Sequence, residues 1–192
     1  LRAYRRQGDL ESALKTGRRA TALEPGNADL WLIQGECHHA LKQFDEAIAC
    51  FNRAIELRPD DLLGYGALVE VQEQRNDMVA AVDIYERLIA RNPDSAALHY
   101  QLASTLAQIN DRDGAIAAYR KVIELEPRVV QAHLLLGLLL MDAGQQGEAV
   151  ARLQHYLELR PGDVTALESL AGAYERAGST PEALACLRQI LS

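Results

Sequence analysis

Residues 28–61 have the sequence ADLWLIQGECHHALKQFDEAIACFNRAIELRPDD, and this stretch decides the fold. Two sets of residues follow each other in it at helical spacing, with a break between them. The first set is Leu30, Trp31, Gln34, Gly35 and His38, and the second is Ala47, Ile48, Phe51, Ala54, Ile55 and Leu57. Neither set forms a face that one helix could bury alone. The stretch therefore predicts two helices packed against each other and against neighbouring pairs.

The same pattern recurs along the chain every 34 residues. Two columns of identical residues show this period: Pro25, Pro59, Pro93, Pro127 and Pro161, and Ala13, Ala47, Ala81, Ala115, Ala149 and Ala183. A fixed period of this length is typical of solenoid proteins. We expect one solenoid domain over residues 1–192, with complete repeats at 28–61, 62–95, 96–129 and 130–163. Partial repeats at 1–27 and 164–192 suggest a fragment of a longer chain.

Turn and cap residues support the predicted helix boundaries. Gly or Asn followed by an acid or hydroxyl separates the two helices of several repeats: Gly8-Asp9, Asn76-Asp77, Asn110-Asp111 and Gly178-Ser179. Each recurrent proline disfavours helix in the residue before it, so it ends the second helix. Asp60-Asp61, Asp94-Ser95 and Gly162-Asp163 then offer caps for the next helix.

Five residues of the quoted stretch carry a resemblance to a known family: Trp31, Gly35, Ala47, Phe51 and Pro59. Their spacing resembles the tetratricopeptide repeat. The resemblance covers the whole chain and implies an all-α, right-handed superhelix (a solenoid) of antiparallel helix pairs. It also implies that the first helix of each repeat lines a concave groove. The pentatricopeptide repeat, which binds RNA, fits the period and the charge less well.

Composition excludes several classes of protein. The chain has 192 residues, of which 48% are hydrophobic and 24% charged, so it is expected to fold. Its net charge of −7 disfavours nucleic acid as a partner. The longest apolar stretch, 134–141, is far below the roughly 20 residues that span a membrane. Three cysteines without a Cys-x-x-Cys spacing, and no visible signal peptide, favour a reducing, cytoplasmic location.

The resemblance places candidate binding residues on the groove face of the first helices. That face includes Ala97 and Gln131, and our candidate peptide-binding residues on it are Arg2, Arg5, Glu36, His39, Glu70, Glu73, Tyr100, Leu134, Leu138 and Met141. We hypothesise that Leu134, Leu138 and Met141, with Tyr100, form an exposed apolar patch that anchors a partner segment. Acidic side chains in repeats 28–61 and 62–95 then receive its basic residues. The alternative is that the helix 131–141 packs within its own chain and that the glutamates form a solvated face.

The sequence does not favour a catalytic site or a metal site. His99 and His133 occupy the repeat position of Trp31, which predicts packing between helices. Glu36-x-x-His39 and Glu70-x-x-Glu73 have a spacing that metal sites use, but such sites lie in a dry interior, whereas this face is open. No phosphate loop, nucleophile elbow or zinc-protease motif is present. We expect no enzyme activity, cofactor or metal.

The sequence therefore predicts a non-catalytic scaffold that binds a partner peptide or helix, with basic and apolar residues, in its concave groove. The alternative function is a substrate-recruiting arm of a multidomain enzyme, of the glycosyltransferase or sulfotransferase kind, with its catalytic domain outside this chain. Self-association through the ends of the solenoid is a third possibility.

Overall fold

A computed structural model describes residues 9–191. Within that range the chain consists of eleven α-helices joined by short turns, and no strand is present. The expected all-α architecture of paired helices is thus confirmed. The chain divides into two compact units, Leu1–Asn92 and Pro93–Ser192, which we call the N-terminal half and the C-terminal half.

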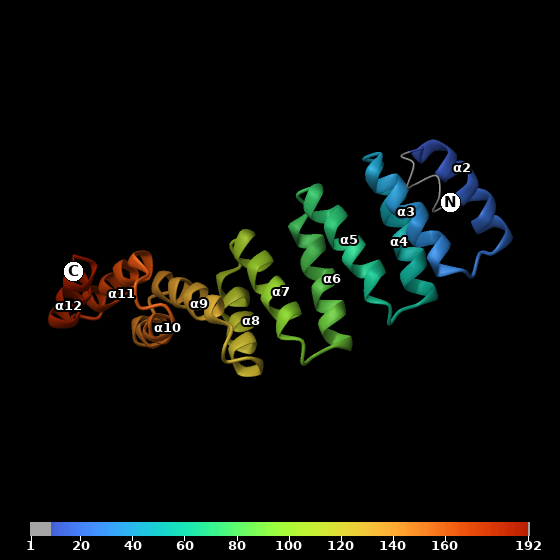
Figure 1. Ribbon diagram of the computed structural model, residues 1–192. Helices are drawn as coiled ribbons and strands as arrows, with labels where there is room; N and C mark the ends of the chain where they lie inside the picture. The colour runs from blue at the N-terminus through green and yellow to red at the C-terminus, as the bar shows by residue number, and fades with distance from the viewer. Residues whose placement is uncertain (1–8, 192) are drawn as a thin grey trace. The chain divides into compact units, whose positions relative to one another are not determined.

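The N-terminal half contains five described helices, which Figure 1 labels. They are α2 (Leu10–Leu23), α3 (Ala28–Ala40), α4 (Phe44–Leu57), α5 (Leu62–Gln74) and α6 (Met78–Arg91). Each helix packs against the next, and the first helices α3 and α5 also contact each other. Helices α3 and α5 begin at the first residues of the repeats that the period predicts.

The described residues of the C-terminal half form six helices in the same order of first and second helices, which Figure 1 labels. They are α7 (Ala96–Gln108), α8 (Arg112–Leu125), α9 (Val130–Asp142), α10 (Gln146–Leu159), α11 (Val164–Arg176) and α12 (Thr180–Ile190). Neighbouring helices pack in order, and α9 also contacts α11. In each half, one pair of first helices from consecutive repeats therefore lies side by side, α3 with α5 and α9 with α11.

The turn between the two helices of a repeat has the same backbone conformation in five repeats. One residue in each turn has a positive φ, between 57° and 79°: Lys42, Asn76, Asn110, Gly144 and Gly178. These residues are 34 positions apart, and Asn and Gly are the residues that adopt this conformation most readily. Asp77 and Asp111 follow two of them and cap the next helix with their carboxylates. The predicted caps Asp61, Ser95 and Asp163 likewise accept backbone N–H groups.

The core of each repeat is a contact between small and large side chains. All six alanines of the recurrent column are at most 2% exposed. Four positions later, Phe51, Tyr85, Tyr119 and Leu153 are buried as well. A Cβ added to Gly35 would lie 2.5 Å from Cε1 of Phe51, and one added to Gly137 would lie 2.8 Å from Cγ of Leu153. In these two repeats the helices therefore approach so closely that an added methyl group would meet the facing side chain.

Candidate functional site: an apolar pocket between α7, α8 and α9

The acidic candidates lie on the first helices of the N-terminal half. Glu36 on α3 and Glu70 and Glu73 on α5 are exposed, and His39 is half-buried, with its ring centroid 6.1 Å from that of Phe44. Arg2 and Arg5 lie outside the described residues. Within residues 9–191 no three His, Cys, Asp or Glu side chains are placed to hold a metal ion. The glutamates thus form an acidic surface on two contacting helices.

The apolar candidates on α9 are partly covered by neighbouring helices. Leu134, Leu138 and Met141 are all half-buried. Leu134 and Met141 pack against a buried cluster that helices α10, α11 and α12 supply. The Cε atom of Met141 also lies 3.6 Å from the position of a Cβ on Gly172. Two of the three side chains therefore pack largely within their own chain, as the alternative interpretation of this helix expects.

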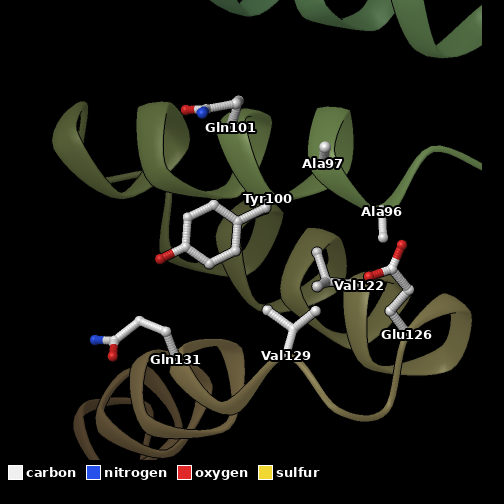
Figure 2. Close-up of a pocket in the computed structure, with 8 residues that line it drawn as sticks. All are labelled: Ala96, Ala97, Tyr100, Gln101, Val122, Glu126, Val129 and Gln131. Atoms are coloured by element: carbon white, nitrogen blue, oxygen red, sulfur yellow. The ribbon is translucent and has the colours of Figure 1, made fainter.

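Tyr100 instead lies in a pocket of about 350 Å³ between α7, α8 and the start of α9. The pocket is lined by Ala96, Ala97, Tyr100, Gln101, Val122, Glu126, Val129 and Gln131. Figure 2 shows the Tyr100 ring projecting from α7 toward α9, with Val122 and Val129 beside it. Most of the lining atoms are carbon, because alanine, valine and the tyrosine ring supply the walls. A concave apolar site with few polar groups is the usual form of a ligand pocket.

The pocket is built on a rigid floor. Val122 is fully buried and Ala96 is 4% exposed. The Tyr100 ring packs edge-on against the buried Tyr119, with centroids 5.5 Å apart and planes at 79°. The Tyr119 hydroxyl is 2.9 Å from the Ser104 hydroxyl, which fixes its ring to α7. Burial raises the pKa of Tyr119, so this hydroxyl stays neutral at physiological pH. Tyr100 therefore presents one side of its ring to the pocket while Tyr119 supports the other.

Three polar side chains line the pocket. Gln101 on α7, Gln131 on α9 and Glu126 at the end of α8 are all exposed. Figure 2 shows the Glu126 carboxylate directed toward Ala96, and the Gln131 amide below the Tyr100 ring. Within residues 9–191 none of these side chains forms a hydrogen bond or ion pair. They are available to a partner that enters the pocket.

The structure gives His99 and His133 a packing role. Nε2 of His99 donates to the carbonyl of Pro93, and Nε2 of His133 donates to the carbonyl of Pro127, both at 2.9 Å. Nε1 of Trp31 makes the equivalent bond to the Pro25 carbonyl at 3.0 Å. A ring N–H at this position thus joins a first helix to the proline that precedes it. His133 is buried in this position, whereas His99 is half-buried.

The environment of His133 opposes protonation of its ring. It is 2% exposed, and its Nδ1 atom has no hydrogen-bond partner within the described residues. Burial lowers the pKa of His133 most, and the nearby His155 and Arg152 of α10 lower it further, whereas the bond to the Pro127 carbonyl acts in the opposite direction. The centroids of the His133 and His155 rings lie 4.3 Å apart, and Nδ1 of His155 is 3.0 Å from Oε2 of Glu158.

This arrangement predicts a pH-dependent stability. The pKa of His133 is lower in the folded than in the unfolded chain. Neutral His133 therefore adds its full contribution to the free energy of unfolding above about pH 6.5, and this contribution declines as the pH falls. Urea unfolding at pH 7.5, 6.5 and 5.5 measures the decline. We expect a smaller decline for His133→Leu, because Leu167 fills this position, buried, in the last repeat. Equal declines in the two proteins would contradict the prediction, and His99→Leu serves as the control.

Sequence reasoning placed three of the eight lining residues of the pocket on the groove face and missed the other five. Tyr100, Ala97 and Gln131 lie on the face that the family resemblance selects. Val122 instead belongs to the second helix α8, Glu126 is the C-terminal cap residue of that helix, and Val129 lies in the turn before α9. No periodic pattern within one helix indicates the residues that were missed. None of the described helices has both the length and the apolar character needed to span a membrane.

Comparison with known proteins places the whole chain among repeat proteins. A sequence model described as "Tetratricopeptide repeat" matches residues 1–62, 43–96, 67–127, 100–163 and 134–192. Tetratricopeptide repeat protein 37 of Xenopus laevis is 32% identical over 71 residues. That match covers 37% of this chain and 4% of the relative, so the chain corresponds to a small part of that protein's length.

Several solved structures have the same fold. MamA superposes with a TM-score of 0.71 and 22% identity, covering 85% of this chain and 90% of MamA. YrrB, described as a TPR protein with an unusual peptide-binding site, superposes with a TM-score of 0.72 and 19% identity, covering 91% of this chain and 90% of YrrB. A tetratricopeptide repeat protein from Parabacteroides merdae has a TM-score of 0.64 and 20% identity, covering 98% of this chain and 75% of that protein.

Proposed function

This chain belongs to the tetratricopeptide repeat family, and we propose that it is a non-catalytic scaffold that binds a segment of a partner protein along the face lined by its first helices. The observation that carries the proposal is the pocket around Tyr100. Its apolar walls and rigid floor suit the insertion of one large side chain, and such anchors dominate the affinity of most protein interfaces.

The polar groups of the pocket support an extended peptide as its occupant. Gln101 and Gln131 come from two consecutive first helices, and both amides can donate to and accept from a peptide backbone. An extended segment has unpaired backbone N–H and C=O groups along its whole length. The peptide-binding site described for YrrB agrees with this class of partner.

The acidic surface of the N-terminal half is a second contact region in this proposal. Glu36, Glu70 and Glu73 are exposed on α3 and α5 and give that half a face suited to basic side chains of a partner. We retain Leu138 as a contact of the C-terminal half, and we assign the anchoring role to Tyr100.

A peptide selection tests the proposal. The chain is panned against a phage-displayed library of random dodecapeptides, and the affinities of enriched sequences are measured by fluorescence anisotropy. Ala97→Phe fills the pocket from an exposed helix position, so we expect at least a tenfold loss of affinity with an unchanged circular dichroism spectrum. Tyr100→Ala is expected to have a similar effect.

The matched control is Ala151→Phe, which places the same bulk at an exposed position of α10, outside the pocket. It should bind the selected peptides as the unaltered chain does. Enriched peptides that bind equally well to Ala97→Phe, or the absence of any enriched peptide, would refute the proposal.

A further inference from the structure

Glu126 occupies a place that the stability of its own helix does not favour. It is the C-terminal cap residue of α8, where its backbone N–H bonds to the carbonyl of Val122. The C-terminal end of a helix carries partial negative charge, so a carboxylate is unfavourable there and a cation is favourable. The equivalent residues of the other repeats are Glu24, Arg58, Asn92 and Arg160. Two of the four are arginines, and one of these, Arg58, pairs with Asp29.

Glu126 is also unpaired. No cation forms an ion pair with it within residues 9–191, although Arg128 lies only two residues further along the chain. By contrast, Glu124 of the same helix pairs with Lys121 at 2.7 Å, and Glu148 of α10 pairs with Arg120. Glu126 is the single charged residue among those that line the Tyr100 pocket. The pocket therefore combines an apolar interior with one uncompensated negative charge at its edge.

From this combination we propose that the pocket selects a segment in which a large aliphatic or aromatic residue is accompanied, two positions away, by lysine or arginine. The apolar side chain enters between Tyr100, Val122 and Val129, and the cation meets the Glu126 carboxylate. In an extended segment, side chains two positions apart lie on the same side and about 7 Å from each other. That separation suits two groups that contact different walls of one pocket. The inference rests on the proposed function, because it assigns the partner chemistry of the same site.

The contribution of the Glu126 ion pair to the affinity follows from the exposure of that pair. Glu126 is exposed, so its pair with a partner cation remains solvated and contributes a factor of about two to five in affinity. The apolar anchor contributes most of the affinity, and the charge selects among anchored segments. Binding should weaken by the same small factor when the salt concentration is raised, because solvated pairs are screened.

The experiment uses one of the selected dodecapeptides, labelled with fluorescein, and a second peptide in which its Lys or Arg is replaced by Gln. With the unaltered chain we expect the second peptide to bind two- to fivefold more weakly. With Glu126→Gln we expect the two peptides to bind equally. Removing the charge from the end of α8 should leave the fold intact, since it relieves an unfavourable interaction with the helix dipole. Glu124→Gln is the matched control, and it should retain the preference for the basic peptide.

Each outcome decides the inference. Selected peptides that lose affinity for Ala97→Phe but contain no Lys or Arg would overturn the inference and leave the proposed function standing. A basic preference that persists in Glu126→Gln would also overturn it, because another carboxylate must then supply the charge. If sedimentation shows a dimer of the chain that Ala97→Phe dissociates, the occupant is a second copy, and the inference fails as well.

Discussion

Replacing Gly35 with alanine is expected to destabilise the protein by about 2 kcal/mol. The new methyl group would lie 2.5 to 3.0 Å from three ring carbons of Phe51, a side chain that is fully buried. Overpacking at such a contact forces the two helices of the repeat apart. Urea unfolding followed by circular dichroism measures the loss.

Gly66→Ala is the matched control for this prediction. Gly66 also lies inside a first helix, α5, but nothing is within 4 Å of its added Cβ. There the substitution should raise stability by about 0.5 to 1 kcal/mol, because alanine is the better helix former. If both substitutions change stability in the same direction, close packing at Gly35 is not what holds the repeat together.

The second large effect is expected for Leu153→Ala, which should cost about 2 to 5 kcal/mol. Leu153 is fully buried on α10, in the cluster that also contains Leu170 and Ala173 of α11. Truncating it leaves a cavity between three helices, because its neighbours are held by their own contacts. The same urea titration measures the loss.

A double-mutant cycle with Gly137→Ala shows whether the predicted contact is responsible. Alone, Gly137→Ala should destabilise the protein, because the added Cβ would lie 2.8 Å from Cγ of Leu153. In the Leu153→Ala background that obstacle is gone and the methyl group fills part of the cavity. The double variant should therefore be more stable than the sum of the single effects predicts, by about 0.5 to 3 kcal/mol. Simple additivity would contradict the contact.

The fold was predictable from the sequence because it repeats. Each alanine of the recurrent column and each turn residue has equivalents 34 positions away, so single departures do not obscure the pattern. Lys42 shows this, since it adopts the positive φ of Asn76 and Asn110 although lysine does not favour it. Helix pairing also followed, because neither helix of a repeat can bury its apolar face alone.

The site was predictable only in part. The family resemblance selects one face of the first helices, and Tyr100 lies on it, but the pocket needs Val122 and Glu126 from the end of α8. Their approach depends on how three helices pack, which no periodic pattern in one helix encodes. Helix α9 shows the converse case. It is apolar on nearly all sides, so the sequence alone leaves open that Leu134 and Met141 are covered by the following helices.

The most direct test of the account is to find where a bound peptide's anchor lies. A selected dodecapeptide is synthesised with photo-leucine in place of its large apolar residue, irradiated in complex with the chain, and the cross-linked residues are identified by mass spectrometry. We expect cross-links to residues 96–101 of α7 and to Val122, Val129 or Gln131. Cross-links to the exposed leucines of α12, Leu184 and Leu187, with none in the pocket, would contradict it.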